Sequence, residues 1–343
     1  MQAGGKVDIS RYDYAIGLEI SMNQFGQTQT GLARRSVIAA FGLAALMPAA
    51  VTGAAVRRAF RDGQKPFAFA EVDVFSPQPL RGNPLAVVIA ADALSDADMA
   101  LFSKWTNLSE TTFLLRPIRP EADYRVRIFS HGEELPFAGH PTLGSCHVWL
   151  SSGGKAKGSY IMQECGIGLV RLRHKSGRLA FEAPPLRQSQ PVDPGVLDRI
   201  RRGLGLTEGE ITASRLLDGG LEVNAVMIAS RDRLLALKPD WPTLAIGGVG
   251  VIAPWAPFHV AGQPDFEVRV FDQTLTGSED PVTGSFNAAV ARWLIGAQMA
   301  PDQYLVSQGT VMGRTGRIHV NKDADGLWIG GDVADRIEGT VLF

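Results

Sequence analysis

The chain has 343 residues, of which 45% are hydrophobic, and it contains 38 glycines and 20 prolines. This length and composition predict a globular protein with two ordinary domains and argue against a disordered chain. The 34 basic and 35 acidic side chains nearly cancel, so no strong field favours binding to nucleic acid or to an anionic membrane surface. Recognition of a substrate must therefore be local.

The first residues, 1–65, are predicted to be a leader and linker. Two arginines, Arg34 and Arg35, precede an apolar run over residues 37–50, a pattern typical of a twin-arginine export signal. The small residues 52–54 would offer a cleavage site. The sequence therefore predicts passage through the export machinery and a periplasmic or exported protein.

Two other interpretations of the leader stay open. The apolar run could remain as an uncleaved anchor, although it is short for a spanning helix once Pro48 is counted. It could also be an ordinary apolar helix in a cytoplasmic protein whose start codon was placed too early. For the export signal, Met22 could be the true start, which would leave a short polar leader before the arginines.

From Phe67 the chain changes to short apolar runs bounded by turn residues, which indicate strands. Predicted strands cover residues 69–75, 85–89, 113–115 and 124–129, and the clearest predicted helices cover 95–105, 141–150 and 281–295. In the last of these strands Tyr124, Val126 and Ile128 share one face, as in a half-buried strand. Ser95 is expected to cap the first helix. The fold class is therefore α+β.

An internal repeat divides this region. A strand followed by a loop, a proline and a helix occurs twice, with the two prolines, Pro141 and Pro281, 140 positions apart. The repeat predicts two similar halves facing one cleft, over residues 66–186 and 187–343, with the terminal strand a candidate to cross to the other half. In this alignment His140 and Asp280 are counterparts.

The residues beside the two prolines favour anion binding. Because proline is preferred at the first helical position, His140 and Asp280 are predicted to be N-caps. Two helix N-termini facing one cleft would hold a substrate carboxylate with backbone N–H groups, and Ser145 or Ser285 could assist. The helix dipole should also lower the pKa of His140 and favour its neutral form.

Glu110 is the candidate acid/base. It lies in the turn of residues 107–112, between a predicted helix and an apolar strand. Partial burial there would raise the pKa of its carboxyl and allow it to take and return a proton. Each of Glu110, His140 and Asp280 taken singly could equally be a solvated or capping residue.

Five motifs together resemble those of the PhzF family, and they occur in the family's order. They are Arg81-Gly-Asn-Pro-Leu-Ala-Val87, Asn107-Leu-Ser-Glu-Thr-Thr-Phe113, Glu134-Leu-Pro-Phe-Ala-Gly-His-Pro-Thr142, Glu279-Asp-Pro-Val-Thr-Gly-Ser285, and Ser307-Gln-Gly309 with Gly313-Arg314. The resemblance covers the chain from Phe67 to its end.

The resemblance implies a diaminopimelate-epimerase-like fold, in which each half wraps a mostly antiparallel sheet around a central helix, and often a homodimer. It implies an isomerase without cofactor or metal, acting on a small carboxylate; the best-understood member isomerises dihydro-hydroxyanthranilate in phenazine synthesis. Glu110 would then be the general acid/base, assisted by His140, Asp280 and Ser285. The implied substrate-binding residues are Asn83, Gly139, Thr142, Gly284 and Gln308.

Two alternatives to this isomerase remain. One is a non-catalytic small-molecule binding protein on the same scaffold, and the other is an epimerase acting at an α-carbon. The predicted paired loops offer His140 and Asp280 where related epimerases have two cysteines, which argues against two-thiol racemisation. Phe286 stands where the family usually has alanine, so it is expected to narrow the pocket.

Overall fold

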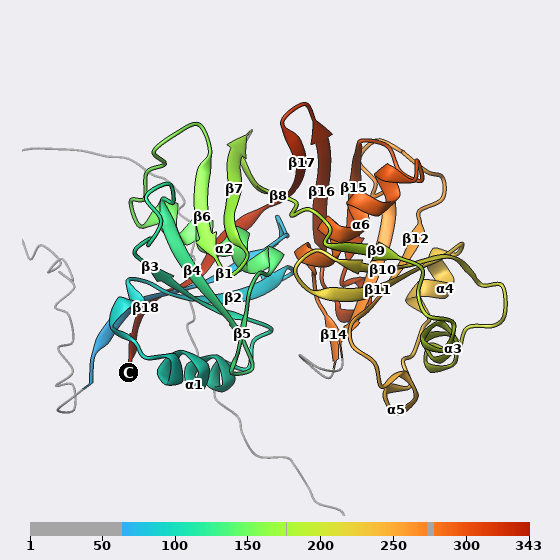
Figure 1. The fold of residues 1–343 in the computed structure, drawn as a ribbon, viewed down its shortest axis with the longest axis horizontal. Coiled ribbons are helices and arrows are strands. Elements are labelled where there is room, and N and C mark those ends of the chain that lie inside the picture. The colour runs from blue at the N-terminus through green and yellow to red at the C-terminus, as the bar shows by residue number, and fades with distance from the viewer. Residues whose placement is uncertain (1–63, 176, 273–277) are drawn as a thin grey trace, which may run out of the picture. The chain divides into compact units, whose positions relative to one another are not determined.

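The computed structural model describes residues 64–175, 177–272 and 278–343. The elements of the N-terminal half are β1 (Pro66–Val74), β2 (Asn83–Val88), η1 (Ala91–Ala93), α1 (Asp96–Thr106), β3 (Thr111–Leu115), β4 (Tyr124–Ser130), β5 (Glu133–Leu135), α2 (Gly139–Ser151), β6 (Ile161–Cys165), β7 (Gly168–Lys175) and β8 (Arg178–Glu182). Figure 1 shows them in blue to green.

The rest of the chain forms a second set of similar elements. They are β9 (Gln188–Gln190), α3 (Pro194–Gly203), β10 (Ile211–Asp218), β11 (Glu222–Ile228), α4 (Arg231–Leu235), α5 (Trp241–Leu244), β12 (Val249–Pro254), β13 (Phe266–Asp272), β14 (Ser278–Asp280), α6 (Gly284–Gly296), β15 (Gln303–Gln308), η2 (Thr310–Met312), β16 (Gly316–Asp323), β17 (Gly326–Gly331) and β18 (Val333–Leu342).

The two sets pair their strands in the same order. In the first, β1 to β4 are joined by an antiparallel, a parallel and an antiparallel step, after which β4 runs parallel to β6, and β7 and β8 continue antiparallel. In the second, β10 to β13 and then β15 to β17 repeat every step. The series meet where β8 pairs with β17. This confirms the predicted α+β fold with two pseudo-symmetric halves.

The last strand lies against the first half. β18 pairs antiparallel with β1, and at the corresponding place in the second half β9 pairs with β10. The C-terminal strand therefore completes the sheet of the N-terminal half, in the position that β9 fills in the other.

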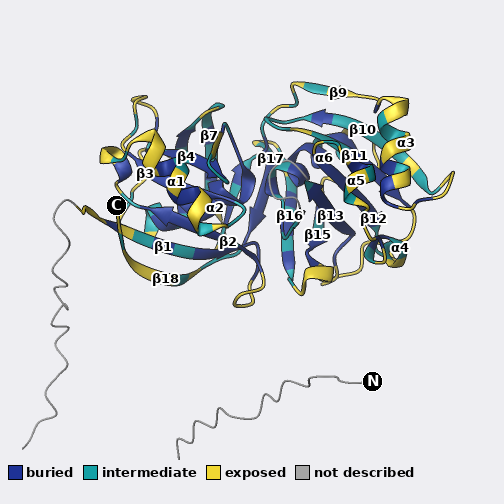
Figure 2. Cartoon of the chain, turned by 90° about the horizontal axis from the view of Figure 1, so that it is seen from below, coloured by how far each residue is buried: buried dark blue, intermediate teal, exposed yellow. Residues whose placement is uncertain are grey.

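The helices α2 and α6 are central because they are apolar on nearly all sides. Most residues of both are buried, as expected for a helix without a polar face. Leu143 and Cys146 of α2 and Leu294 of α6 belong to one hydrophobic core that spans both sheets. Figure 2 shows this buried interior in dark blue.

The helix α1 covers a smaller core of its own half. Ser95 caps it as predicted, accepting a hydrogen bond from the Asp98 amide while the Asp98 side chain binds the Ser95 amide. The predicted alternation of the β4 strand is also confirmed. On the outer side of α1, Leu101 and Trp105 are 69% and 77% exposed.

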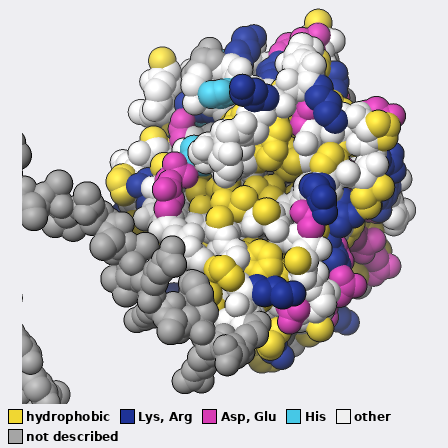
Figure 3. Space-filling model, turned by 90° about the vertical axis from the view of Figure 1, so that its left-hand side faces the viewer, with side chains coloured by type: hydrophobic (Ala, Val, Ile, Leu, Met, Phe, Trp, Pro, Cys, Tyr) yellow, Lys and Arg dark blue, Asp and Glu magenta, His cyan; other side chains and the backbone are white. Residues whose placement is uncertain are grey.

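Hydrophobic side chains also gather in a hollow on the face at the left of Figure 1 (Figure 3). Exposed apolar surface of this kind is a candidate contact surface. The homodimer that the resemblance implies stays a prediction.

The predicted export signal and its cleavage site lie outside the described residues. Within the described ranges, no helix is long and apolar enough to cross a membrane.

The central helices begin at residues other than those predicted. Ala138 is the N-cap of α2 and Thr283 that of α6, so the prediction that His140 and Asp280 are N-caps is wrong. His140 lies in the first turn of α2, where the following proline is tolerated because no intrahelical hydrogen bond is required of its nitrogen. Asp280 instead ends β14, held in the strand by its pairing with Val270.

These starting points also correct the register of the repeat. Gly139 and Gly284 are each the first residue of a central helix of 13 residues. The structural counterpart of His140 is therefore Ser285, and the predicted pairing of His140 with Asp280 is wrong. The two prolines are not structural counterparts, because Pro141 lies inside α2 whereas Pro281 lies before α6.

The two helix N-termini meet at glycine. A Cβ built on Gly139 would lie 2.5 Å from the carbonyl carbon of Gly284, and one built on Gly284 would lie 3.0 Å from the carbonyl carbon of Gly139. Atoms at the shorter of these distances would clash, so a side chain at Gly139 must force the backbones apart.

We expect the substitution Gly139→Ala to reduce the free energy of unfolding by about 1–3 kcal/mol, the usual cost of overpacking a closed contact. Urea unfolding followed by circular dichroism would measure it. Gly158→Ala is the matched control, because a Cβ there meets no atom within 4 Å. Equal effects of the two substitutions would contradict the close contact.

Candidate functional site

A cleft between the two halves lies beside the N-terminus of α6. Its empty volume, open mouth included, is about 690 Å³. The lining residues come from both halves, and they are Ser109, Glu110, Ser130, Gly219, Leu221, Glu222, Val223, Gly248, Val270, Asp272, Asp280, Thr283, Ser285 and Phe286.

Glu110 is the residue before β3, and it lines the cleft. The helix α1 ends at Asn107 in the left-handed conformation, and the hydroxyl of Ser130 donates a 2.8 Å hydrogen bond to the carbonyl of Ser109. The Glu110 side chain is almost fully buried, with 9% of the residue exposed. Burial raises its pKa well above the ordinary value, and the negative charges of Asp280 and Asp272 add to the effect.

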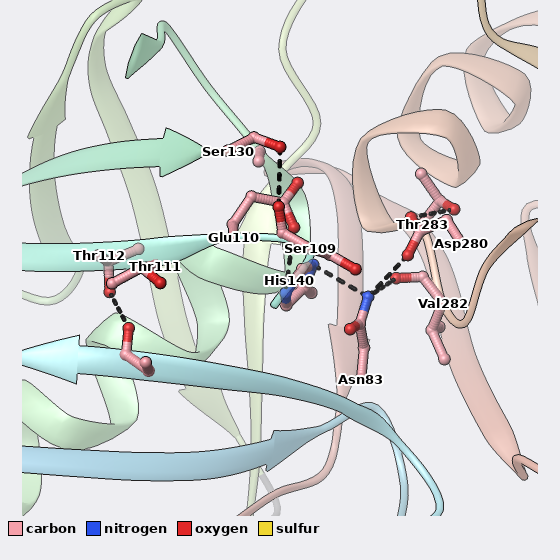
Figure 4. A network of polar contacts seen from close by, with 12 residues as sticks. Asn83, Ser109, Glu110, Thr111, Thr112, Ser130, His140, Asp280, Val282 and Thr283 are labelled. Atoms are coloured by element: carbon pink, nitrogen blue, oxygen red, sulfur yellow. Dashed lines mark hydrogen bonds and ion pairs between the residues drawn. The ribbon is translucent and has the colours of Figure 1, made fainter. Parts of the chain in front are cut away.

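His140 lies next to Glu110, below it in Figure 4. Burial lowers the pKa of His140 to about 3, against a hydrogen bond with the backbone carbonyl of Pro84, so the imidazole is neutral near pH 7. Its Nε2 is 3.5 Å from Glu110 Oε2, which is long for a hydrogen bond. Within the described residues neither of these two atoms has a hydrogen-bond partner.

Asn83 joins the two helix starts. Its amide nitrogen donates to Asp280 Oδ1 at 2.9 Å and to the carbonyl of Val282 at 3.0 Å, and it lies 3.3 Å from His140 Nδ1. An amide has two hydrogens, and the two oxygens take both. Asn83 therefore hydrogen-bonds the segment before α6 and lies beside the histidine of α2 (Figure 4).

Asp280 is fixed as a hydrogen-bond acceptor. Its Oδ2 accepts a 2.6 Å hydrogen bond from the hydroxyl of Thr283, and the side chain of Gln308 donates to its backbone carbonyl at 3.2 Å. Burial raises the pKa of Asp280, the hydrogen bonds from Thr283 and Asn83 oppose this, and the charge of Asp272 raises it further.

The predicted site residues fall into two groups. Glu110, Asp280 and Ser285 line the cleft, whereas the other candidates are not among its lining residues. Asn83, Thr142 and Gln308 are fully buried and bind neighbouring groups of the protein. Gly139 and Gly284 form the contact between the helices.

Sequence reasoning missed five polar residues that line the cleft, namely Ser109, Ser130, Glu222, Asp272 and Thr283. Thr283 stood within a recognised motif, and Asp272 follows Phe271 as Ser130 follows Phe129 in the repeat. No sequence signal marked Glu222. Among the described residues, no group of three or more His, Cys, Asp or Glu side chains is placed to hold a metal ion.

Phe286 lines the cleft, as its size led us to expect. Its ring lies over Gly250 of β12, where a built Cβ would be 2.0 Å from Phe286 Cζ. The ring therefore occupies the space that a side chain at residue 250 would need.

This contact predicts an energetic coupling between the two positions. Gly250→Ala should cost about 1–3 kcal/mol of unfolding free energy in the wild type and clearly less in a Phe286→Ala background, where the ring is gone. A double-mutant cycle by urea unfolding would measure the coupling, expected at about 0.5–3 kcal/mol. Strictly additive effects would show that the Phe286 ring is not the cause of the destabilisation by Gly250→Ala.

Comparisons with known proteins agree with this architecture. The family model described as phenazine biosynthesis-like protein (PhzC-PhzF) matches residues 72–336. Antisense-enhancing sequence 1 of Schizosaccharomyces pombe is 33% identical over 292 residues, covering 79% of this chain and 97% of that protein. Trans-2,3-dihydro-3-hydroxyanthranilate isomerase of Pseudomonas aeruginosa is 30% identical over 271 residues, covering 74% and 90%.

A solved structure shares the fold. The PhzF-family phenazine biosynthesis protein of Bacillus anthracis superposes with a TM-score of 0.68 at 21% identity, covering 81% of this chain and 100% of that one. The chain therefore belongs to the PhzC-PhzF family of phenazine biosynthesis-like proteins and is an isomerase of that family.

Proposed function

We propose that this isomerase moves a proton on a small carboxylate-bearing substrate, without a cofactor, and that Glu110 is the general acid/base. The observation that carries the proposal is a buried carboxyl that lines the cleft and has a raised pKa. Such a group can both donate and accept a proton near neutral pH.

The contacts of His140 support an assignment of its ring hydrogen to one of the two nitrogens. Since its Nε2 has no hydrogen bond in the described part of the chain, the nitrogen bound to the Pro84 carbonyl is Nδ1. Nδ1 then carries the hydrogen, and the lone pair of Nε2 faces Glu110. The protonated Glu110 can donate to that lone pair, so His140 would orient the acid and stabilise it between transfers.

The helix starts provide the place for a substrate carboxylate. The first N–H groups of α2 and α6 have no acceptor within their own helices, and the positive ends of both dipoles meet there. Ser285 lines the cleft beside them. We assign Ser285 and Asp280 to orienting the substrate, and Asn83, Thr142 and Gln308 to holding these groups in place.

The α-carbon epimerase alternative is less well supported in its two-thiol form. Cys146 is fully buried in the core, and neither Cys146 nor Cys165 lines the cleft. The non-catalytic binding protein stays the main alternative, because a binder would need the same cleft but no acid/base.

The test is solvent-proton exchange. The purified protein would be incubated in D₂O with a panel of small carboxylates that includes dihydro-hydroxyanthranilate, and deuterium incorporation would be followed by NMR. We expect incorporation by the wild type and a loss of about 100-fold or more in Glu110→Gln, the usual contribution of a general acid/base.

Glu338→Gln is the matched control, because this glutamate is exposed on β18, outside the cleft. It should exchange like the wild type. Exchange that persists in Glu110→Gln would exclude Glu110 as the acid/base. Tight binding of a panel member without exchange in the wild type would favour the binding protein.

The raised pKa of Glu110 also predicts a pH dependence of stability. The folded state binds the proton more tightly than the unfolded chain, so this stabilising contribution is complete below pH 4.5, the ordinary pKa, and is lost as the pH rises through the folded-state pKa. Glutamine mimics the neutral acid at every pH.

The unfolding free energy of Glu110→Gln, relative to wild type, should therefore increase with pH above 4.5, by up to about 1.4 kcal/mol per pH unit. Urea unfolding at a series of pH values would measure it, with Glu338→Gln as the flat reference. A constant difference between wild type and Glu110→Gln would show that the pKa is not raised.

A further inference from the structure

A second groove lies outside the cleft, beside the C-terminal end of α1. Its empty volume, open mouth included, is about 720 Å³, and it shares no lining residue with the cleft. We call it the α1 groove, and the residues that line it are Phe69, Glu71, Ala86, Phe102, Trp105, Thr106, Leu108, Thr340 and Val341. They belong to β1, β2, α1, the turn after α1, and β18.

Aromatic rings form much of the α1 groove. The rings of Phe102 and Trp105 stack with their centroids 5.9 Å apart, and the ring of Phe69 stands at 87° to that of Phe102. Trp105 is 77% exposed, so its indole contributes a ring to the groove while remaining largely in contact with water. The faces of such rings carry negative potential and attract cations.

Glu71 places a carboxylate in this apolar groove. It is two residues from Phe69 on β1, and side chains at that spacing lie on the same face of a sheet. Glu71 is half-buried, and burial alone raises its pKa, without a compensating charge or hydrogen bond from the described residues. The described residues that line the groove include no Lys, Arg or His. A partly buried carboxylate of this kind favours a positively charged partner.

The end of α1 adds partial negative charge at the same place. The helix ends at Thr106, with Asn107 as its C-cap in the left-handed conformation, and Trp105 and Thr106 of its last turn line the groove. The last carbonyl groups of a helix have no partner within it, and the helix dipole is negative there. The carboxylate, the ring faces and the helix end therefore all favour a cation.

We infer that the α1 groove binds a small organic ammonium ion, with its charged group beside Glu71 and its apolar part against Phe102 and Trp105. A neutral apolar molecule would leave the Glu71 carboxylate without a counterion, and an anion would be repelled by it. The inference does not depend on the proposed function, because the groove and the cleft have no lining residue in common.

Calorimetric titration of the purified full-length protein with three probes of different charge tests the inference. The probes are benzyltrimethylammonium, benzyl alcohol and benzenesulfonate, which share a benzene ring. We expect the cation to bind about tenfold or more tightly than the other two, since the cation contacts both ring faces and a carboxylate. Glu71→Gln and Trp105→Ala should each weaken its binding by about fivefold or more.

Two matched variants serve as controls. Glu133→Gln removes an exposed glutamate of β5, and Leu101→Ala truncates an exposed side chain of α1. Neither residue lines the α1 groove, so both variants should bind benzyltrimethylammonium like the wild type. Because Trp105 is largely exposed, Trp105→Ala keeps the test valid if Glu71→Gln fails to fold.

Equal affinities of the three probes for the wild type would overturn the inference, because the groove would then recognise only the ring. Binding of the cation that survives in the Glu71→Gln, Trp105→Ala double variant would overturn it too, since the cation would then lie elsewhere, for example in the acidic cleft. Folded protein that binds no cation would also overturn it, the result expected if a second copy of the chain covered the groove.

Discussion

The contact between Gly139 and Gly284 is the constraint on which the rest of the structure depends. Each glycine begins the central helix of one half, and the contact leaves no room for a side chain on Gly139. Because the helix ends approach so closely, the single side chain of Asn83 can reach His140 on one side and Asp280 on the other, within 3.3 Å of both. Separating the helix ends would move Asn83 and Asp280 away from His140, so the packing of the two halves sets the geometry of the site.

Three buried polar atoms at and near Asn83 lack a hydrogen-bond partner among the described residues. Asn83 Oδ1, Glu110 Oε2 and His140 Nε2 are all buried without a hydrogen-bond partner in the described part of the chain. Each such atom typically costs about 1–3 kcal/mol, which the hydrophobic core around α2 and α6 must offset. A network in which every atom was satisfied would leave no acceptor for a substrate proton. The unsatisfied atoms are therefore consistent with the proposed role of Glu110 in proton transfer.

Much of the fold could be predicted from local signals, whereas the starts of α2 and α6 and the register of the repeat could not. Alternation in β4 and the cap at Ser95 depend on neighbouring residues, so the sequence displays them directly. Helix starts depend on which carbonyl accepts the first hydrogen bond, and strand pairing holds Asp280 out of α6. The burial of Asn83 and the place of Glu222 were not predicted, for a related reason. Their surroundings come from segments distant in the sequence, which bury one and bring the other to the cleft.

The corrected register shows how two similar halves produce an unequal site. Thr111 and Val249 occupy equivalent places in the strand order, each opposite the preceding parallel strand, so Gly248 is the counterpart of Glu110. By the same pairing Asp272 is the counterpart of Ser130. Each half thus contributes one carboxylate, but at a different one of the two positions, and Asp280 is already engaged by Asn83 and Thr283. The proposed mechanism therefore uses one buried acid/base, Glu110, with a glycine at its counterpart position. A single acid/base of this kind would favour removal and return of a proton on the same face of the substrate over inversion of a stereocentre.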